Sequence, residues 1–494
     1  MEIKEKSEAE QDFEHISKDI KHYNNFMQTL FSEISKKKFS VFKYIKLSKD
    51  KLLENMELNV KELVIYINKL DENINKEIYK LLSCIYGSFL GDAEGGYCEF
   101  SGANINNMNK IFIGNPLFGE SPGQVTDDSE MAMSFAFAIL DNPDFGDLNS
   151  DYLFYFYGLW HLSKPRDEGI TTRKALRLFK VSDFNPEKTN NYEKTFQTIK
   201  KNNNKSLANG FIMRTSPFIV WCYFRYKKQI LETFNSKDNS KGLFDLFLTI
   251  RIQAHKDNIC THPNDSLSVA HSLFCIMSLG AICDLKPAQI LNNMETLLKE
   301  KFFKQKESSD IKNMILSEIQ FYKKDEKKLL CNINYSFNYF TSGNNNVNTH
   351  MGFYYHAFRL TLFYLYYFDE IKGDNNYTKF RTINNQICCF GGDTDTNAAI
   401  VGAVIGPLIG YKNFGEKDFE KMVSLVPKKR FIFTPALMVI YVHFLKDNIN
   451  NGGKLRMNFL KMIIYILFEK IDVNNLSQIF SKYEIKNSIN EKNK

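Results

Sequence analysis

The side chains best suited to chemistry in this 494-residue sequence lie in two short acidic segments, TDD at 126–128 and GGDTDT at 391–396. In the second segment, carboxylates alternate with hydroxyls directly after a glycine pair and before the apolar run Ala398 to Ile409. Capping a helix takes a single side chain of this kind, so the segment carries more acidic groups than capping requires. Carboxylates at positions i and i+2 with a threonine hydroxyl form a hard-oxygen set typical of Mg²⁺, Mn²⁺ or Ca²⁺ sites.

The first segment has a simpler interpretation when it is taken alone. It continues as TDDSE at 126–130 and enters an apolar stretch. Asp, Ser and Thr at the start of a helix satisfy free backbone N–H groups and interact well with the helix dipole. Helix capping therefore remains open as its role until the second segment is considered.

Two common metal sites do not fit the second segment. If Asp393, Asp395 and Asn397 were positions one, three and five of a calcium-binding hand, position six would be Gly and position twelve Glu. The sequence has Ala398 and Val404 there instead. Neither segment contains a histidine, which disfavours zinc. These patterns favour magnesium or manganese.

The number of carboxylates allows for two metal ions. Two closely spaced cations need several shared carboxylates, and the two segments together supply four (Asp127, Asp128, Asp393 and Asp395). A dinuclear site with ligands from both segments is therefore the prediction.

Five motifs in a fixed order link these segments to a known family. They are GSFLGDA at 87–93 with EF at 99–100, TDD at 126–128, NGFIMR at 209–214, TH at 261–262, and GGDTDT at 391–396. In this order the motifs resemble those of the ADP-ribosylglycohydrolase family, which includes dinitrogenase reductase-activating glycohydrolase and the ADP-ribosylarginine and ADP-ribosylserine hydrolases. The resemblance covers residues 78 to about 415.

The resemblance implies an all-α fold, two Mg²⁺ ions with Mn²⁺ as an alternative, and a role for each motif. The implied metal ligands are Thr126, Asp127, Asp128, Asp393, Asp395 and Thr396. The implied catalytic residues are Glu99, as a mobile acid near the scissile bond, with Asp128 and Asp393. The implied substrate-binding residues are Asp92, Asn209, Gly210 and His262, and Arg214 is expected to support the NGFIMR loop.

The implied reaction is removal of ADP-ribose from a modified protein side chain or another ADP-ribose conjugate, by attack of water on the anomeric carbon of the distal ribose. Such cleavage passes through an oxocarbenium-like state that nearby carboxylates stabilise. An arginine linkage is favoured, followed by a serine linkage. Two alternatives stay open: a dimetal phosphoesterase, and a degenerate family member that only binds ADP-ribose or has a structural role.

The sequence departs from the family pattern at three positions. Glu94 stands where an apolar residue is usual, Ala208 replaces the first glycine of G-N-G, and Ser129 stands where Thr is common. None of these changes removes an implied ligand. They bear on the shape of the groove and on the linkage that is cleaved.

The pattern of apolar residues predicts an all-α protein with helical extensions at both ends, and the family resemblance implies a compact domain of orthogonally packed helices. Helices are expected at 130–140, 265–282, 350–367 and 397–409, and strand-like alternation is scarce. The expected organisation is a charged extension at 1–75, whose helices are interpreted as solvated, a catalytic domain at 76–447 and a tail at 448–494.

Several other residues have a structural and a functional interpretation. His350, Phe353, Tyr354 and His356 could contact an adenine, but aromatic residues at helical spacing favour the core. We interpret a further group as structural or buried: Trp160, His161, His271, His443, Cys388 and Cys389.

Composition narrows the class of protein further. The net charge of +7 comes from scattered lysines, which is weak support for nucleic-acid binding. Nine cysteines at irregular spacings favour a reducing compartment, and the N-terminal segment lacks the apolar core of a secretory signal. The apolar runs at 433–445 and 459–468 are shorter than the roughly 20 residues of a membrane helix. We expect a cytoplasmic monomer that binds neither nucleic acid nor membranes.

Overall fold

The computed structural model describes most of residues 49–450. It therefore includes only the last part of the expected extension at 1–75 and the first residues of the tail at 448–494. The positions inside this range that lie outside the described residues are 71, 74, 108–120, 143–145, 186–187, 237–239, 326–331, 372–375, 415 and 428–431.

All regular secondary structure in the described residues is helical, which confirms the predicted all-α class. Backbone pairing of the β type is limited there to one isolated bridge between Ala208 and Phe353. The α-helices are α3 (Lys49–Lys69), α4 (Lys76–Gly95), α5 (Asp127–Asp141), α6 (Ser150–Leu162), α7 (Ile170–Leu176), α8 (Glu193–Asn203), α9 (Ser216–Arg225), α10 (Lys227–Asn235), α11 (Ser240–Asn258), α12 (Asp265–Ile282), α13 (Pro287–Leu297), α14 (Lys306–Lys324), α15 (Ile333–Thr341), α16 (Tyr354–Tyr366), α17 (Asn376–Phe390), α18 (Thr394–Ile409), α19 (Glu416–Val423) and α20 (Met438–Asn450).

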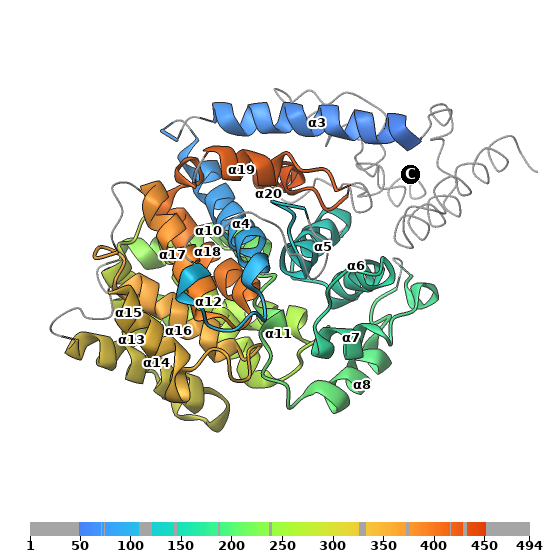
Figure 1. The fold of residues 1–494 in the computed structure, drawn as a ribbon. Coiled ribbons are helices and arrows are strands. Elements are labelled where there is room, and N and C mark those ends of the chain that lie inside the picture. The colour runs from blue at the N-terminus through green and yellow to red at the C-terminus, as the bar shows by residue number, and fades with distance from the viewer. Residues whose placement is uncertain are drawn as a thin grey trace, which may run out of the picture.

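Helices α4 and α18 lie in the middle of the fold (Figure 1), and their backbones touch. A Cβ atom on Gly91 would lie 2.3 Å from the carbonyl oxygen of Ala398, and one on Gly402 would lie 2.1 Å from the carbonyl oxygen of Gly87. Only glycine permits so close an approach. The contact fixes the C-terminal end of α4 beside the N-terminal end of α18, where the GGDTDT segment lies.

Helix α12 packs against both central helices and is buried almost throughout. Among the described helices it alone is long and apolar enough to cross a membrane by length and composition, but 89% of this stretch is buried inside the protein. Its His271 hydrogen bonds with Asn258 at 3.0 Å and with Thr215 at 3.1 Å. The structural interpretation of His271 is therefore confirmed.

Helix α3 exposes charged residues such as Glu57 and Lys61, in line with the interpretation of its charged face as solvated, but its opposite face is buried. Met56, Val60, Leu63 and Ile67 recur every three or four residues and are buried in the same hydrophobic core as α4. The Tyr66 hydroxyl and the ring of His443 in α20 are 2.9 Å apart, which gives this half-buried histidine a structural partner as predicted.

All four predicted helices are present, but three of them begin at a residue other than the expected one. Helix α12 has the predicted bounds, whereas α5 and α18 begin three residues earlier than predicted, at Asp127 and Thr394. Acidic side chains suit the first turn of a helix, so both helices extend back into their motifs. Helix α16 begins at Tyr354 and not at His350, which has a φ of +52° and cannot continue a right-handed helix.

Substitution of Gly91 by Ala is expected to destabilise the protein by at least about 2 kcal/mol, because the added methyl group meets the backbone of α18. Denaturant unfolding monitored by circular dichroism measures this change. Gly242→Ala in α11 is the matched control: its new methyl group meets only the Thr233 side chain, at 3.2 Å, and Ala favours the helix. Equal stabilities of the two variants would contradict the proposed backbone contact.

Candidate metal and substrate site

The two acidic segments meet in the folded chain, at the N-terminal ends of α5 and α18. The Thr126 hydroxyl donates to Asp128 Oδ2 at 3.0 Å and contacts Asp395 Oδ2 at 3.4 Å. The Thr396 hydroxyl donates to the same Asp128 oxygen at 3.3 Å. Residues about 270 positions apart in sequence thus share one set of oxygen atoms.

The glycine pair before Asp393 makes this arrangement possible. Gly391 and Gly392 have φ angles of +76° and +81°, in the left-handed region that glycine adopts without strain. A Cβ on Gly392 would lie 2.5 Å from the carbonyl oxygen of Val347. The Gly392 carbonyl accepts a hydrogen bond from the Phe100 N–H at 3.0 Å, which holds the neighbouring Glu99 beside the metal loop.

Two overlapping groups of buried carboxylates are close enough to hold cations. Glu99, Asp393 and Asp395 form one group, and Asp92, Asp128 and Asp395 form the other. Within each group the oxygen atoms lie within 4.8 Å of one another. Glu99, predicted as a mobile acid, is thus also close enough to Asp393 and Asp395 to share a cation with them.

The electrostatics of these groups fit a metal centre. Burial raises the pKa values of Asp128 and Asp395 well above the usual range, and nearby carboxylates raise them further. Burial together with the charge of Asp393 raises the pKa of Glu99 to about 10. Asp128 Oδ1 is buried and has no hydrogen-bond partner among the described residues. Unpaired buried carboxylates are costly, and a divalent cation supplies the missing charge and ligation.

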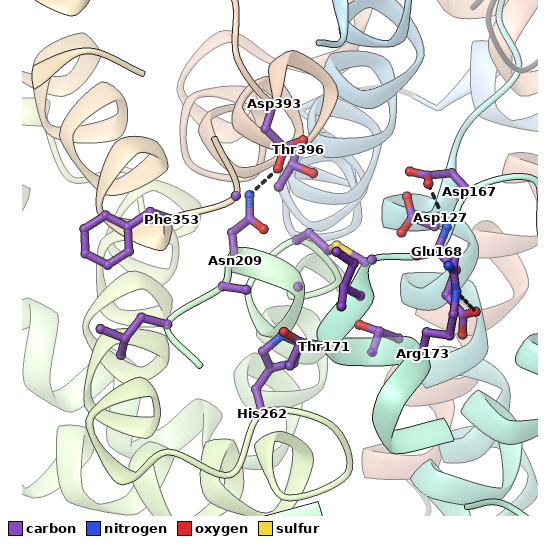
Figure 2. A pocket seen from close by; sticks show the side chains of 18 of the residues that line it. Asp127, Asp167, Glu168, Thr171, Arg173, Asn209, His262, Phe353, Asp393 and Thr396 are labelled. Atoms are coloured by element: carbon purple, nitrogen blue, oxygen red, sulfur yellow. Dashed lines mark hydrogen bonds and ion pairs between the residues drawn. The ribbon is translucent and has the colours of Figure 1, made fainter. Parts of the chain in front are cut away.

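A groove of about 850 Å³ opens onto this cluster. Glu99, Asp127, Asp393 and Thr396 contribute to its walls from the predicted metal and catalytic set. Figure 2 shows Asp127 and Asp167 on the opposite side of Asn209 from Phe353. The volume is that of a typical small-molecule site.

Three of the four predicted substrate-binding residues line the groove: Asn209, Gly210 and His262. Asn209 Nδ2 donates to Asp393 Oδ2 at 2.7 Å, and its backbone N–H donates to the Gly352 carbonyl at 2.8 Å. A Cβ on Gly210 would lie 2.9 Å from the His262 ring. Burial lowers the pKa of His262 to about 3, so the ring is neutral.

The fourth residue, Asp92, is placed differently. It is fully buried and does not line the groove. Its carboxylate instead accepts hydrogen bonds from Thr126 and Ser129 at the start of α5. The predicted contact between Asp92 and substrate stays a prediction.

Sequence reasoning missed the segment at 167–173, which forms one wall of the groove. Asp167 and Glu168 both line the groove, and the carboxylate of Asp167 interacts electrostatically with that of Asp127. Glu168 is held by Arg173 at 3.2 Å and by His161 at 2.6 Å, so His161 supports a groove residue. The sequence feature that could have indicated this wall is the acidic pair Asp167 and Glu168, which directly precedes Gly169 and a short helix.

The aromatic segment near residue 350 is divided between groove and core. His350 is exposed and lines the groove, so the core interpretation is wrong for this residue. Phe353 lines the groove and also packs against the hydrophobic core. Tyr354 and His356 are buried, and His356 Nε2 is 2.8 Å from the Thr349 carbonyl oxygen, so the core interpretation is confirmed for them.

Other predicted supporting residues lie behind the groove. Arg214 is fully buried, pairs with Asp257 at 3.3 Å and stacks over the Tyr157 ring at 4.3 Å. Glu94 is also buried and accepts a hydrogen bond from Asn384 on α17, so this departure from the family pattern lies outside the groove lining. Three residues interpreted as buried or structural are buried in the structure: Trp160, Cys388 and Cys389.

Comparison with known proteins identifies the class that this fold and site define. The sequence profile of the ADP-ribosylglycohydrolase family matches residues 75–422. The chain therefore belongs to the ADP-ribosylglycohydrolase family, whose members are metal-dependent hydrolases acting on ADP-ribosylated substrates.

One named relative and one solved structure are similar to this chain. The chain is 26% identical over 334 residues to a protein of Acanthamoeba polyphaga mimivirus that bears the name of an ADP-ribosyl glycohydrolase. The match covers 66% of this chain and 86% of the viral protein. A solved structure described as an ADP-ribosylglycohydrolase-related protein complex aligns with a TM-score of 0.46 and 16% identity, over 74% of this chain and 97% of that one.

Divalent cations are expected to stabilise the folded protein, because they neutralise carboxylates that repel one another when buried. Mg²⁺ at 100 times its dissociation constant should raise the free energy of unfolding by about 2.7 kcal/mol. Thermal unfolding in EDTA and in Mg²⁺ measures the difference. Asp128→Asn should be more stable than the wild type in EDTA and should lose the response to Mg²⁺. A wild type with the same melting temperature in both buffers would contradict the metal centre.

Proposed function

We propose that this protein is a Mg²⁺-dependent hydrolase that removes ADP-ribose from modified protein side chains, with arginine as the favoured linkage and serine as the next. The observation that carries the proposal is the junction of a groove of about 850 Å³ with a buried cluster of carboxylates. Two Mg²⁺ ions, with Mn²⁺ as a substitute, are held in this proposal by Thr126, Asp127, Asp128, Asp393, Asp395 and Thr396.

The metal ions supply a polarised water molecule and bind hydroxyl oxygens of the distal ribose when they are present. The protein itself orients the substrate and places negative charge near the reacting sugar. Asn209, fixed by its bond to Asp393, presents its side chain at the point where the groove meets the carboxylates. The Glu99 carboxyl lies beside Asp393, close to where an oxocarbenium-like sugar develops positive charge.

Support for an arginine linkage comes from the side of the groove next to the carboxylates. Asp167 is half-buried there and interacts electrostatically with Glu99 and Asp127. A guanidinium group is cationic and planar, and it pairs well with carboxylates. A serine hydroxyl is neutral and gains little from an acidic wall.

Phe100 supplies a second surface that suits a guanidinium. It lines the groove, is 50% exposed and has a φ of +55°, an unusual conformation for a bulky residue. Guanidinium planes stack favourably on aromatic rings. An exposed ring next to Glu99 is therefore consistent with a leaving group that carries such a plane.

Asp393→Ala is expected to abolish release of ADP-ribose, because it removes a metal ligand and the partner of Asn209. Chromatography of the products formed from arginine-, serine- and poly-ADP-ribosylated substrates in Mg²⁺ measures both rate and product. Undiminished release of ADP-ribose by the variant would contradict the mechanism. Release of AMP or phosphate by the wild type would identify a phosphoesterase, and binding without turnover would identify a degenerate member.

Asp167→Asn is expected to lower kcat/KM for arginine-linked substrate by about 10- to 100-fold, the effect of losing a hydrogen bond to a charged group. The serine-linked substrate should be affected less than about threefold, since its leaving group carries no charge. Parallel assays on the two substrates give the ratio. Asp183→Asn, at an exposed carboxylate outside the groove, serves as the control. Equal losses on both substrates would rule out recognition of arginine by Asp167.

A further inference from the structure

The first turn of α5 is capped in an unusual way. Thr126 occupies the position that precedes the helix, yet its side chain makes no capping hydrogen bond. A threonine in this position usually accepts a hydrogen bond from a backbone N–H two or three residues later. The N–H of Ser129, which would be that donor, bonds instead to Asp92 Oδ2 at 3.1 Å.

Asp92 belongs to another helix, α4, and satisfies several donors of α5 at once. The Thr126 N–H donates to its two carboxylate oxygens at 3.0 and 3.1 Å. The Ser129 hydroxyl also donates to Oδ2. The close contact between α4 and α18 holds Asp92 in place, because a Cβ on the adjacent Gly91 would lie 2.3 Å from the Ala398 carbonyl oxygen.

This exchange of partners leaves the Thr126 hydroxyl available to the metal cluster. It donates to Asp128 Oδ2 at 3.0 Å and approaches Asp395 Oδ2 at 3.4 Å. If Thr126 capped its own helix, its oxygen would face the backbone of α5 and not these carboxylates. The cap supplied by Asp92 therefore decides where a candidate metal ligand points.

We propose that Asp92 is a positioning residue for the metal centre: it caps α5 from α4 and so holds Thr126 and Asp128 in the orientation that binds cations. Asp92 lies close enough to Asp128 and Asp395 to share a cation with them, but in this proposal it acts through its hydrogen bonds. Its Oδ2 atom accepts from the Thr126 N–H, the Ser129 N–H and the Ser129 hydroxyl, and the Thr126 N–H is shared with Oδ1, so the start of α5 engages both oxygens. Supporting groups of this kind set the affinity of a metal site through the orientation of its ligands. The proposal rests on the metal centre of the proposed function but not on its substrate.

The test is calorimetric titration of the full chain with Mn²⁺, without substrate, which separates failure of this proposal from failure of the proposed activity. Asp92→Asn keeps the size of the side chain but turns an amide towards N–H donors, and it should weaken Mn²⁺ binding by about 10- to 100-fold. Its melting temperature should also respond less than that of the wild type to Mn²⁺ relative to EDTA. Unchanged Mn²⁺ affinity would overturn the proposal.

Asp151→Asn is the matched control for loss of a buried carboxylate. Asp151 on α6 is 5% exposed and accepts hydrogen bonds from the N–H groups of Asn191 at 2.8 Å and Tyr192 at 3.2 Å, outside the groove. This variant should lose the same stability in EDTA and in Mn²⁺ and keep wild-type affinity for the ion. Equal weakening of Mn²⁺ binding in the Asp151 and Asp92 variants would show a general structural effect and overturn the proposal.

Ser129→Ala distinguishes positioning from direct ligation and decides the question if Asp92→Asn does not fold. It removes one donor to Asp92 and no carboxylate. Loosening the cap should weaken Mn²⁺ binding severalfold if Asp92 acts by position. If Asp92 were itself a ligand, removal of a competing donor would leave the affinity unchanged or raise it, and either result would overturn the proposal.

Discussion

Repulsion between buried carboxylates is the constraint on which the site depends. Asp127, Asp128, Asp393 and Asp395 are all at least nine-tenths buried, and burial raises the pKa of each; nearby carboxylates raise the pKa values of Asp127, Asp128 and Asp395 further. A buried charge is tolerated only when hydrogen bonds or an opposite charge compensate for lost hydration. Threonine hydroxyls, the Asn209 amide and the positive ends of two helices provide part of this compensation. A divalent cation completes the compensation, and this requirement explains why the ligands are held by helices.

Such a concentration of charge requires a rigid backbone, because mobile carboxylates would move away from one another. The backbone contact between α4 and α18 provides it, because glycines on both helices remove the side chains that would separate them. A carboxylate exposed to water can turn away from its neighbours, but one carried by helices in backbone contact has few alternatives. The same contact places Asp92 under the start of α5. The packing of α4, α5 and α18 thereby controls the direction of the Thr126 hydroxyl. Small changes where these helices meet would therefore shift the proposed metal ligands.

The groove combines a rigid side with a charged one. Its rigid side comes from two loops joined by the bridge between Ala208 and Phe353, with His262 packed beneath Gly210. Backbone groups there are suited to a ligand of fixed shape, such as the ADP-ribose that family members recognise. The charged side is the segment that contains Asp167, which faces the site from a different part of the chain. Recognition of the common ADP-ribose group and of the variable leaving group can therefore change separately.

The sequence alone determined the all-α class, the bounds of α12 and the two sets of candidate ligands, because these depend on local periodicity and on motifs whose members are neighbours in the chain. It did not give the hydrogen-bond partners of Asp92 or the buried face of α3, and it missed Asp167 as a groove residue. Only the tertiary structure decided these points. The direction of the Asp92 carboxylate depends on α5, 34 residues away, and Asp167 reaches the groove through the packing of α6 and α7. Local sequence fixes which groups are present, whereas long-range packing fixes which groups face one another.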